Sequence, residues 1–142
     1  MAKPLISKIL KEAGKIKDRE GRIAYLRRND HPALRDVLRI AYDSDVVSAL
    51  PEGVPPYEPD DAPEGHEYQT LYRAFKRFKY FFKGPIANEV PQVRREGMFI
   101  SMLETLHADE AAMLCLAKDK KLKVTGITKK LVKDAFPNLI KK

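Results

Sequence analysis

Residues 66–83 read HEYQTLYRAFKRFKYFFK, and this stretch says most about how the chain folds. It holds seven of the twelve aromatic side chains and five basic ones. At about 100° per residue, the apolar side chains largely share one face of a helix and the cations the other. The apolar face comprises Tyr68, Leu71, Tyr72, Phe75, Phe78 and Phe82, widened by Ala74 and Phe81. The opposite face comprises Arg73, Lys76, Arg77 and Lys83, with Tyr80 among them. The pattern predicts an amphipathic helix whose aromatic face is either core or a partner site.

The segment before this stretch also has helical character. Apolar residues recur at helical spacing from residue 5 to residue 26. Gly14 and Gly21 weaken the middle, which leaves either one bent helix or two short ones. Asp30 can cap a further helix and Pro32 fits its first turn, so we expect that helix to reach about Tyr42.

The segment after it predicts three more helices. Pro91 starts the first of them, whose inward residues we expect to be Val93, Ile100, Leu103 and Leu106, with Met98, Phe99 and Met102 beside them. Residues 111–117, AAMLCLA, are apolar on every side, which predicts the most buried helix of the fold. Thr128 caps a last helix, which Pro137 ends.

Residues 51–65, PEGVPPYEPDDAPEG, form a long acidic loop. Five prolines and two glycines exclude regular structure there. We expect an extended loop that lies over the core and is pinned by Val54 and Tyr57. Recognition of its prolines by a partner is the alternative.

These elements predict an all-α fold. We expect a single-domain orthogonal bundle of about five to seven helices over residues 1–142, with the proline-rich loop at 51–65 and a lysine-rich segment at 118–142. No apolar run approaches the roughly 20 residues of a membrane span, and no signal-peptide core opens the chain. The lone Cys115 excludes an intramolecular disulfide and fits a reducing compartment. We therefore expect a cytoplasmic protein with no membrane contact.

Sequence signatures of catalysis are absent. The chain has no phosphate-binding glycine loop and no HExxH, CxxC or GxSxG match. His66 has acidic neighbours that could bind a metal, but they are typical of a solvated loop. Cys115 reads as a buried hydrophobic residue. We expect no enzyme, no metal and no cofactor.

The net charge of +7 is distributed in blocks. Residues 43–67 hold eight acids and no base, whereas residues 68–95 hold seven bases against one acid. Charges before Lys118 sum to zero, so the last 25 residues carry the whole net charge. Such blocks predict basic and acidic patches, which either pair inside the molecule or meet phosphate or an acidic partner.

Two basic surfaces follow from these blocks. The first, the aromatic basic surface, comprises Arg73, Lys76, Arg77 and Lys83 around Tyr80. Arginine binds phosphate through two hydrogen bonds and tyrosine stacks on an exposed base, so this set suits single-stranded nucleic acid. Its alternative is pairing with the acidic loop. The second, the lysine surface, comprises Lys118, Lys120, Lys121, Lys123, Lys129, Lys130 and Lys133, with Lys141 and Lys142 at the tail. Lysines alone predict sequence-independent attraction to phosphate, or simply solubility.

Three segments resemble a family of short proteins encoded by large tailed bacteriophages, particularly marine ones that infect cyanobacteria and other aquatic bacteria. They are DHPALRDVLRIAYDSDV at 30–46 followed by LPEGVPPYEPDDAPEG at 50–65, FISMLETLHADEAAMLCLAKDKKL at 99–122, and ITKKLVKDAFPNLI at 127–140. That family has no assigned activity, fold or catalytic residue. The resemblance implies a setting, which is the cytoplasm of an infected bacterium or the virion.

Three functional hypotheses remain open at this point. The leading one is a non-enzymatic phage accessory protein that binds nucleic acid, or a nucleic-acid-processing machine, through its basic surfaces. The second is a minor structural virion protein that docks on other phage proteins. The third is an inhibitor or modulator of a host protein. Salt dependence of binding separates the first from the others.

Overall fold

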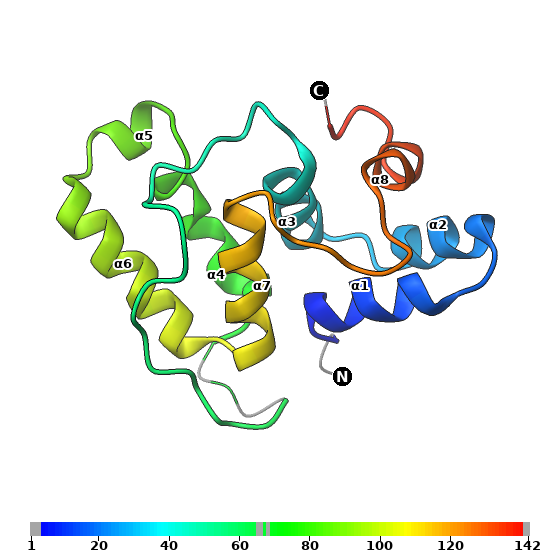
Figure 1. Ribbon diagram of the computed structural model, residues 1–142, viewed down its shortest axis with the longest axis horizontal. Helices are drawn as coiled ribbons and strands as arrows, with labels where there is room; N and C mark the ends of the chain where they lie inside the picture. The colour runs from blue at the N-terminus through cyan, green and yellow to red at the C-terminus, as the bar shows by residue number, and fades with distance from the viewer. Residues whose placement is uncertain (1–3, 65–66, 68, 141–142) are drawn as a thin grey trace.

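The computed structural model describes residues 4–64, 67 and 69–140 and is built of helices (Figure 1). The elements are α1 (Ile6–Lys15), α2 (Arg19–Arg28), α3 (Pro32–Tyr42), α4 (Leu71–Ala74), the 3₁₀ helix η1 (Phe75–Tyr80), α5 (Pro85–Asn88), α6 (Gln92–Thr105), α7 (Ala108–Lys118) and α8 (Lys129–Ala135). The described residues include no strand, only two isolated bridges. The predicted all-α class is confirmed. Six of these α-helices have seven or more residues, and α4 and α5 are single turns.

The helices are arranged around α3 and α7, which pack on each other. Figure 1 shows α5 and α6 on one side of this pair, and α1, α2 and α8 on the other. On that second side, α1 packs on α2 and α2 packs on α8. Buried side chains from both sides join one hydrophobic core. Within the described residues, every helix is too short or too polar to span a bilayer.

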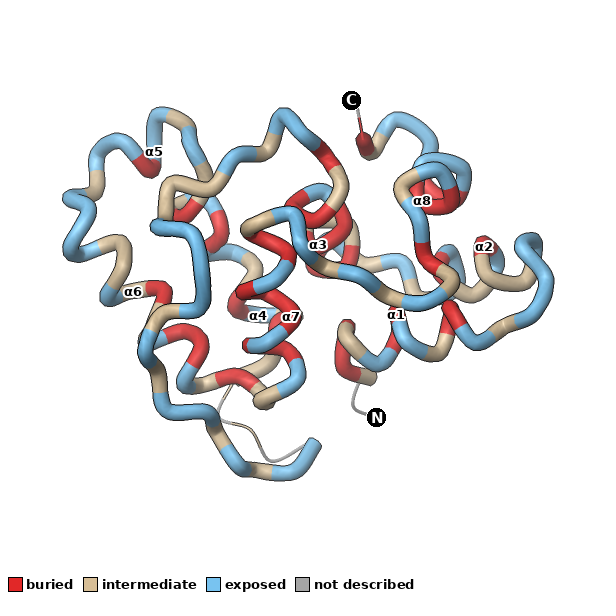
Figure 2. Tube along the Cα trace, viewed as in Figure 1, coloured by how far each residue is buried: buried red, intermediate tan, exposed pale blue. Residues whose placement is uncertain are grey.

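Helix α7 lies at the centre, as its apolar sequence predicts. Seven of its eleven residues are buried, more than in any other described helix. The burial is not complete, since Leu116 is 43% exposed. Figure 2 shows α7 largely in the colour of buried residues, with exposed positions between them. One of its buried residues is Glu110, whose carboxylate accepts hydrogen bonds from the backbone N–H groups of Ile6 (2.7 Å) and Ser7 (2.8 Å). It caps α1, whose own N-terminal N–H groups have no other helical partner.

The N-terminal segment forms two short helices. Asp18 separates them, and its carboxylate accepts from the N–H of Gly21 at 2.8 Å. The predicted cap of α3 is wrong by one residue: His31, not Asp30, precedes the first helical residue, and its Nδ1 accepts from the N–H of Ala33 at 3.0 Å. Asp30 lies one position too early to cap, and instead pairs with Arg35 at 2.9 Å.

Residues 66–83 do not form the single helix that the sequence pattern predicts. Within the described residues, one α-helical turn, α4, is followed by the six-residue 3₁₀ helix η1. A 3₁₀ helix has three residues per turn, so side chains three apart lie above one another. The residues with this spacing are Tyr72, Phe75, Phe78 and Phe81. The three-residue aromatic period therefore fits η1 better than the 3.6-residue period of an α-helix. His66 and Tyr68 lie outside the described residues.

The aromatic face of this segment packs on the core. Phe81 is fully buried, and its ring centroid lies 5.3 Å from that of Phe99 in α6. Phe78 is buried, and Tyr72, Phe75 and Phe82 are partly buried against the core. Phe78 and Phe81 are therefore core, whereas Tyr72, Phe75 and Phe82 pack on the core and keep part of each ring exposed.

Helix α6 begins after Pro91, as predicted, but its first turn extends past the core. Val93, which we expected to face inward, is 85% exposed. Phe99, Met102 and Leu103 in the second half are buried, as Figure 2 shows along the helix. The prediction for Val93 is wrong because apolar spacing shows which face points inward and not how far the core reaches along the helix.

The described part of the proline-rich loop is irregular, as predicted. Tyr57 packs against the core, but Val54 is 65% exposed and pins nothing. Polar contacts hold the loop instead. The N–H of Gly53 donates to Asp119 and the N–H of Glu58 donates to Glu104, each at 2.8 Å. The prolines remove backbone donors from this segment, and two of the remaining N–H groups donate to carboxylates, one in α6 and one in the residue after α7.

Candidate nucleic-acid interface

Five cations of the segment from Arg73 to Lys83 lie on the surface around η1. These are Arg73, Lys76, Arg77, Lys79 and Lys83, and all are exposed. Among the described residues, none of them has an acidic partner within 4.0 Å. Pairing with the acidic loop was the alternative for these cations, but Glu64 of that loop pairs with Lys8 at 3.6 Å and Glu52 with Lys121 at 3.1 Å. The aromatic basic surface is therefore available to a ligand.

The structure divides this surface between two hollows on either side of η1. Arg77 and Tyr80 line a hollow of about 770 Å³ toward α6, which we call the Tyr80 hollow. Lys76, Lys79 and Lys83 line a groove of about 510 Å³ toward α3 and α5, which we call the Ile86 groove. Arg73, although exposed, lines neither.

The Tyr80 hollow joins an aromatic ring to two arginines. The ring of Tyr80 is partly buried against the core, so its position is fixed by packing. Lys79 places its ammonium 5.4 Å from the ring centroid. Arg94, in the first half of α6, lines the same hollow as Arg77, together with Met98. Glu89 lines it as well, so two guanidinium groups share the hollow with one carboxylate.

Arg94 is the site residue that sequence reasoning missed. Its neighbour Arg95 is structural, since it donates to the carbonyl oxygens of Ala87 at 2.7 Å and Val90 at 2.8 Å. The sequence distinguishes the two arginines, because Arg95 lies four residues before Phe99 and therefore on the same inward face of α6. Arg94 is turned about 100° from that face and is exposed.

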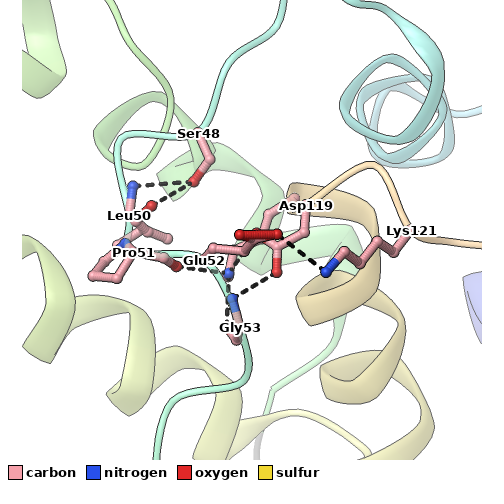
Figure 3. Close-up of polar contacts among 8 residues, drawn as sticks. Ser48, Leu50, Pro51, Glu52, Gly53, Asp119 and Lys121 are labelled. Atoms are coloured by element: carbon pink, nitrogen blue, oxygen red, sulfur yellow. Dashed lines mark hydrogen bonds and ion pairs between the residues drawn. The ribbon is translucent and has the colours of Figure 1, made fainter.

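The predicted lysine surface is wrong at Lys118. This side chain is buried, and its ammonium donates to the carbonyl oxygens of Pro51 (3.0 Å) and Gly53 (2.8 Å). It also pairs with Asp119 at 2.9 Å. Figure 3 shows Asp119 next to the turn at Pro51–Gly53, where it accepts the bond from the Gly53 N–H. Lys118 is a structural clamp for the loop, because the turn leaves backbone carbonyls that need a donor.

Two further lysines of this surface have partners within the molecule. Lys120 extends its ammonium to the end of α3 and donates to the carbonyl oxygens of Ile40 and, at 2.7 Å, Asp43. Burial lowers the pKa of Lys120. Lys121 pairs with Glu52, as Figure 3 shows, and the hydrogen bond to that carboxylate raises the pKa of Lys121. Both side chains are exposed, so phosphate binding by Lys120 and Lys121 stays a prediction.

The remaining members of the lysine surface are separate from η1. Lys123, Lys130 and Lys133 are exposed and Lys129 is partly exposed. Figure 1 shows α8 beside α2, far from α5 and α6. The structure therefore does not bring the two predicted basic surfaces together. Lys141 and Lys142 lie outside the described residues.

Other reactive side chains in the described residues have structural roles. His31 and His107 each cap a helix through Nδ1. Cys115 is buried, and burial raises the pKa of its thiol, which opposes formation of a thiolate. In the described part of the chain, no three His, Cys, Asp or Glu side chains are grouped so as to hold a metal ion. His66, with the metal alternative considered for it, lies outside the described residues.

Fold and site together define a small all-α protein with a basic surface around an aromatic 3₁₀ helix. The chain belongs to a family of unknown function, DUF6433, whose model matches residues 9–124. The matched span contains Arg77, Tyr80 and Arg94 and ends before α8. Comparison with curated proteins and with solved structures finds no significant match.

Proposed function

We propose that this protein binds single-stranded nucleic acid at the Tyr80 hollow without catalysing a reaction. The observation that carries the proposal is the Tyr80 ring, which packs against the core and lines one hollow with Arg77 and Arg94. Neither arginine has an acidic partner within 4.0 Å among the described residues. Stacking of a base on such a ring contributes about 1–3 kcal/mol.

The two arginines fit the phosphates on either side of a stacked base. A guanidinium group binds a phosphate through two parallel hydrogen bonds, which an ammonium cannot do. Arg77 comes from η1 and Arg94 from α6, so the hollow presents guanidinium groups from two different elements. Glu89 in the same hollow disfavours a phosphate close to it, which limits the paths a strand can take.

An unpaired strand suits this hollow better than a duplex. The Tyr80 ring is only partly exposed, so a base must leave a duplex stack to lie on it. Described helices α5 and α6 also present no long recognition helix with a row of basic side chains, such as a major groove would require. The surface is suited to stacking and phosphate contact rather than to reading base pairs.

The test is binding of a labelled single-stranded oligonucleotide of about 16 nucleotides, followed by fluorescence anisotropy. We expect the variant Arg77→Glu with Arg94→Glu to lose binding and to keep its melting temperature, because both side chains are exposed. The matched control is Lys130→Glu with Lys133→Glu on α8, which changes the net charge equally at a distant place. Equal loss in both variants would mean attraction by overall charge, and no loss in the first would exclude the Tyr80 hollow.

We also propose that the protein acts in the cytoplasm of a bacterium infected by a tailed phage. The resemblance of residues 30–46, 50–65, 99–122 and 127–140 to phage proteins supports this setting. Quantitative mass spectrometry of infected cells and of purified particles tests it. A protein abundant in cells and absent from particles fits a role in nucleic-acid transactions, whereas a fixed copy number in particles would favour the structural virion role.

A further inference from the structure

The Ile86 groove has a different chemistry from the Tyr80 hollow. Its floor is apolar and includes Phe75, Phe82 and Ile86, the last of them 44% exposed. Phe75 and Phe82 are partly buried, so part of each ring reaches the groove. The apolar floor is in contact with water when no partner is bound. Its burial by a partner is therefore favourable, by about 25 cal/mol per Å² of apolar surface.

Cations form the rim of this groove. Lys76 and Lys79 come from η1, Lys83 follows it, and Arg39 comes from α3. None of these four has an acidic partner within 4.0 Å among the described residues. The groove also contains Asp36 and Asp45, so four cations face two carboxylates. Burial raises the pKa of Asp36, which means that its charged form is disfavoured there.

From this juxtaposition we propose that the Ile86 groove binds an acidic amphipathic helix of a partner protein. Apolar side chains on one face of that helix, three or four residues apart, lie on Ile86, Phe75 and Phe82. Carboxylates beside them meet Lys76 and Lys83 on the rim. This is the helix-in-groove mode of recognition, with the charge pattern selecting an acidic helix. The proposal is independent of nucleic-acid binding at the Tyr80 hollow.

A nucleic-acid strand fits this groove less well than such a helix. A strand carries a negative charge at every nucleotide and would have to pass both Asp36 and Asp45. A peptide can place an apolar or basic side chain at those points and keep its carboxylates for the lysines. The groove also has no tyrosine and one arginine, whereas the Tyr80 hollow supplies one ring and two guanidinium groups.

The experiment selects ligands without prior choice of a partner. A library of random displayed peptides of about sixteen residues, roughly four helical turns, is panned on the immobilised full-length chain. We expect enrichment of peptides rich in Asp and Glu with apolar residues at i, i+3 or i+4. The best peptide is then titrated against the wild type and against variants. No enrichment, or enrichment of neutral or basic peptides, would overturn the proposal.

Two variants and one control test whether the peptide binds in the Ile86 groove. Lys76→Glu with Lys83→Glu should weaken binding at least about tenfold, and Ile86→Asp should do the same through the floor. All three side chains are exposed, so melting temperature should not change. Arg94→Glu in the Tyr80 hollow should leave peptide affinity unchanged. If Lys76→Glu with Lys83→Glu lowers oligonucleotide binding and not peptide binding, the groove belongs to the nucleic-acid path and the proposal is wrong.

Discussion

The backbones of Gly14 in α1 and Gly126 in the segment before α8 are in close contact. A Cβ atom added to Gly14 would lie 1.9 Å from the carbonyl oxygen of Thr125, and one added to Gly126 would lie 2.4 Å from that of Gly14. Gly126 also has a φ of 86°, a conformation that favours glycine. The segment that leads to α8 therefore crosses α1 at a separation that only two glycines permit.

Because of this contact, we expect replacement by alanine to have opposite effects on stability at Gly14 in α1 and at Gly97 in α6. Gly14→Ala should destabilise the protein by about 1–3 kcal/mol or more, because the new methyl group meets backbone that must move. Gly97→Ala in α6 has open space around it and should stabilise by about 1 kcal/mol, the ordinary gain in helix propensity. Urea unfolding of both variants measures the difference. Stabilisation by Gly14→Ala would show that the close crossing does not exist.

Glu110 predicts a pH-dependent stability. Burial raises the pKa of its carboxyl above the ordinary 4.5, although the bonds from Ser7 and Ile6 act in the other direction. Between pH 4.5 and the folded pKa, the folded state therefore binds more protons than the unfolded state. This contribution to the free energy of unfolding is complete below pH 4.5 and is lost as pH rises through the folded pKa.

The variant Glu110→Gln tests that sign. At neutral pH it should cost about 1–3 kcal/mol, because one of the two buried N–H groups loses its acceptor. The difference in stability between wild type and variant should be larger at mildly acidic pH than at neutral pH. Urea unfolding at a series of pH values measures it. A difference that grows as pH rises would mean that the two backbone bonds outweigh burial.

Lys118 and Asp119 predict how strongly the proline-rich loop is held. Lys118→Met leaves the Asp119 carboxylate, whose side chain is 8% exposed, without its cation. Breaking a buried pair in this way costs about 3–5 kcal/mol. We also expect faster proteolysis within residues 51–64, because the carbonyl oxygens of Pro51 and Gly53 lose their donor. Chemical denaturation and limited proteolysis measure the two effects.

The exposed Lys130 of α8 provides the control for that substitution. Lys130→Met should change stability by no more than about 0.5 kcal/mol, as is usual at the surface. If Lys118→Met behaves like Lys130→Met, the clamp does not hold the loop. Addition of Asp119→Asn to Lys118→Met should recover part of the loss, because it removes the unpaired charge.

Local features of the fold were predictable from sequence. Thr128 caps α8 through its hydroxyl, which accepts from the N–H of Leu131 at 3.1 Å, and Pro91 precedes α6. Both signals act within one turn of the helix that they start. The three-residue spacing of Phe75, Phe78 and Phe81 also indicates the η1 helix. A search for the 3.6-residue period of an α-helix does not detect this spacing.

Features that join distant segments were not predictable. Glu110 bonds residues more than 100 positions away, and Lys118 bonds the loop 65 and 67 positions earlier. A run of lysines shows their charge and not which of them has a carbonyl partner elsewhere. The same holds for the candidate site. Arg77 and Tyr80 were predictable because they lie in one segment, whereas Arg94 joins them only through the packing of α6 beside η1.

Binding of a single-stranded oligonucleotide to the wild type, Tyr80→Leu and Tyr80→Phe, measured at about 50 and 200 mM salt, shows whether the Tyr80 ring contributes to nucleic-acid binding. Wild type and Tyr80→Phe should bind tightly and lose affinity steeply with salt, because both keep a ring for stacking. Tyr80→Leu fills similar space without an aromatic ring and should lose about 1–3 kcal/mol, or roughly 5-fold to 150-fold in affinity. Absence of wild-type binding at low salt, or equal affinity of Tyr80→Leu and the wild type, would contradict nucleic-acid binding at the Tyr80 hollow.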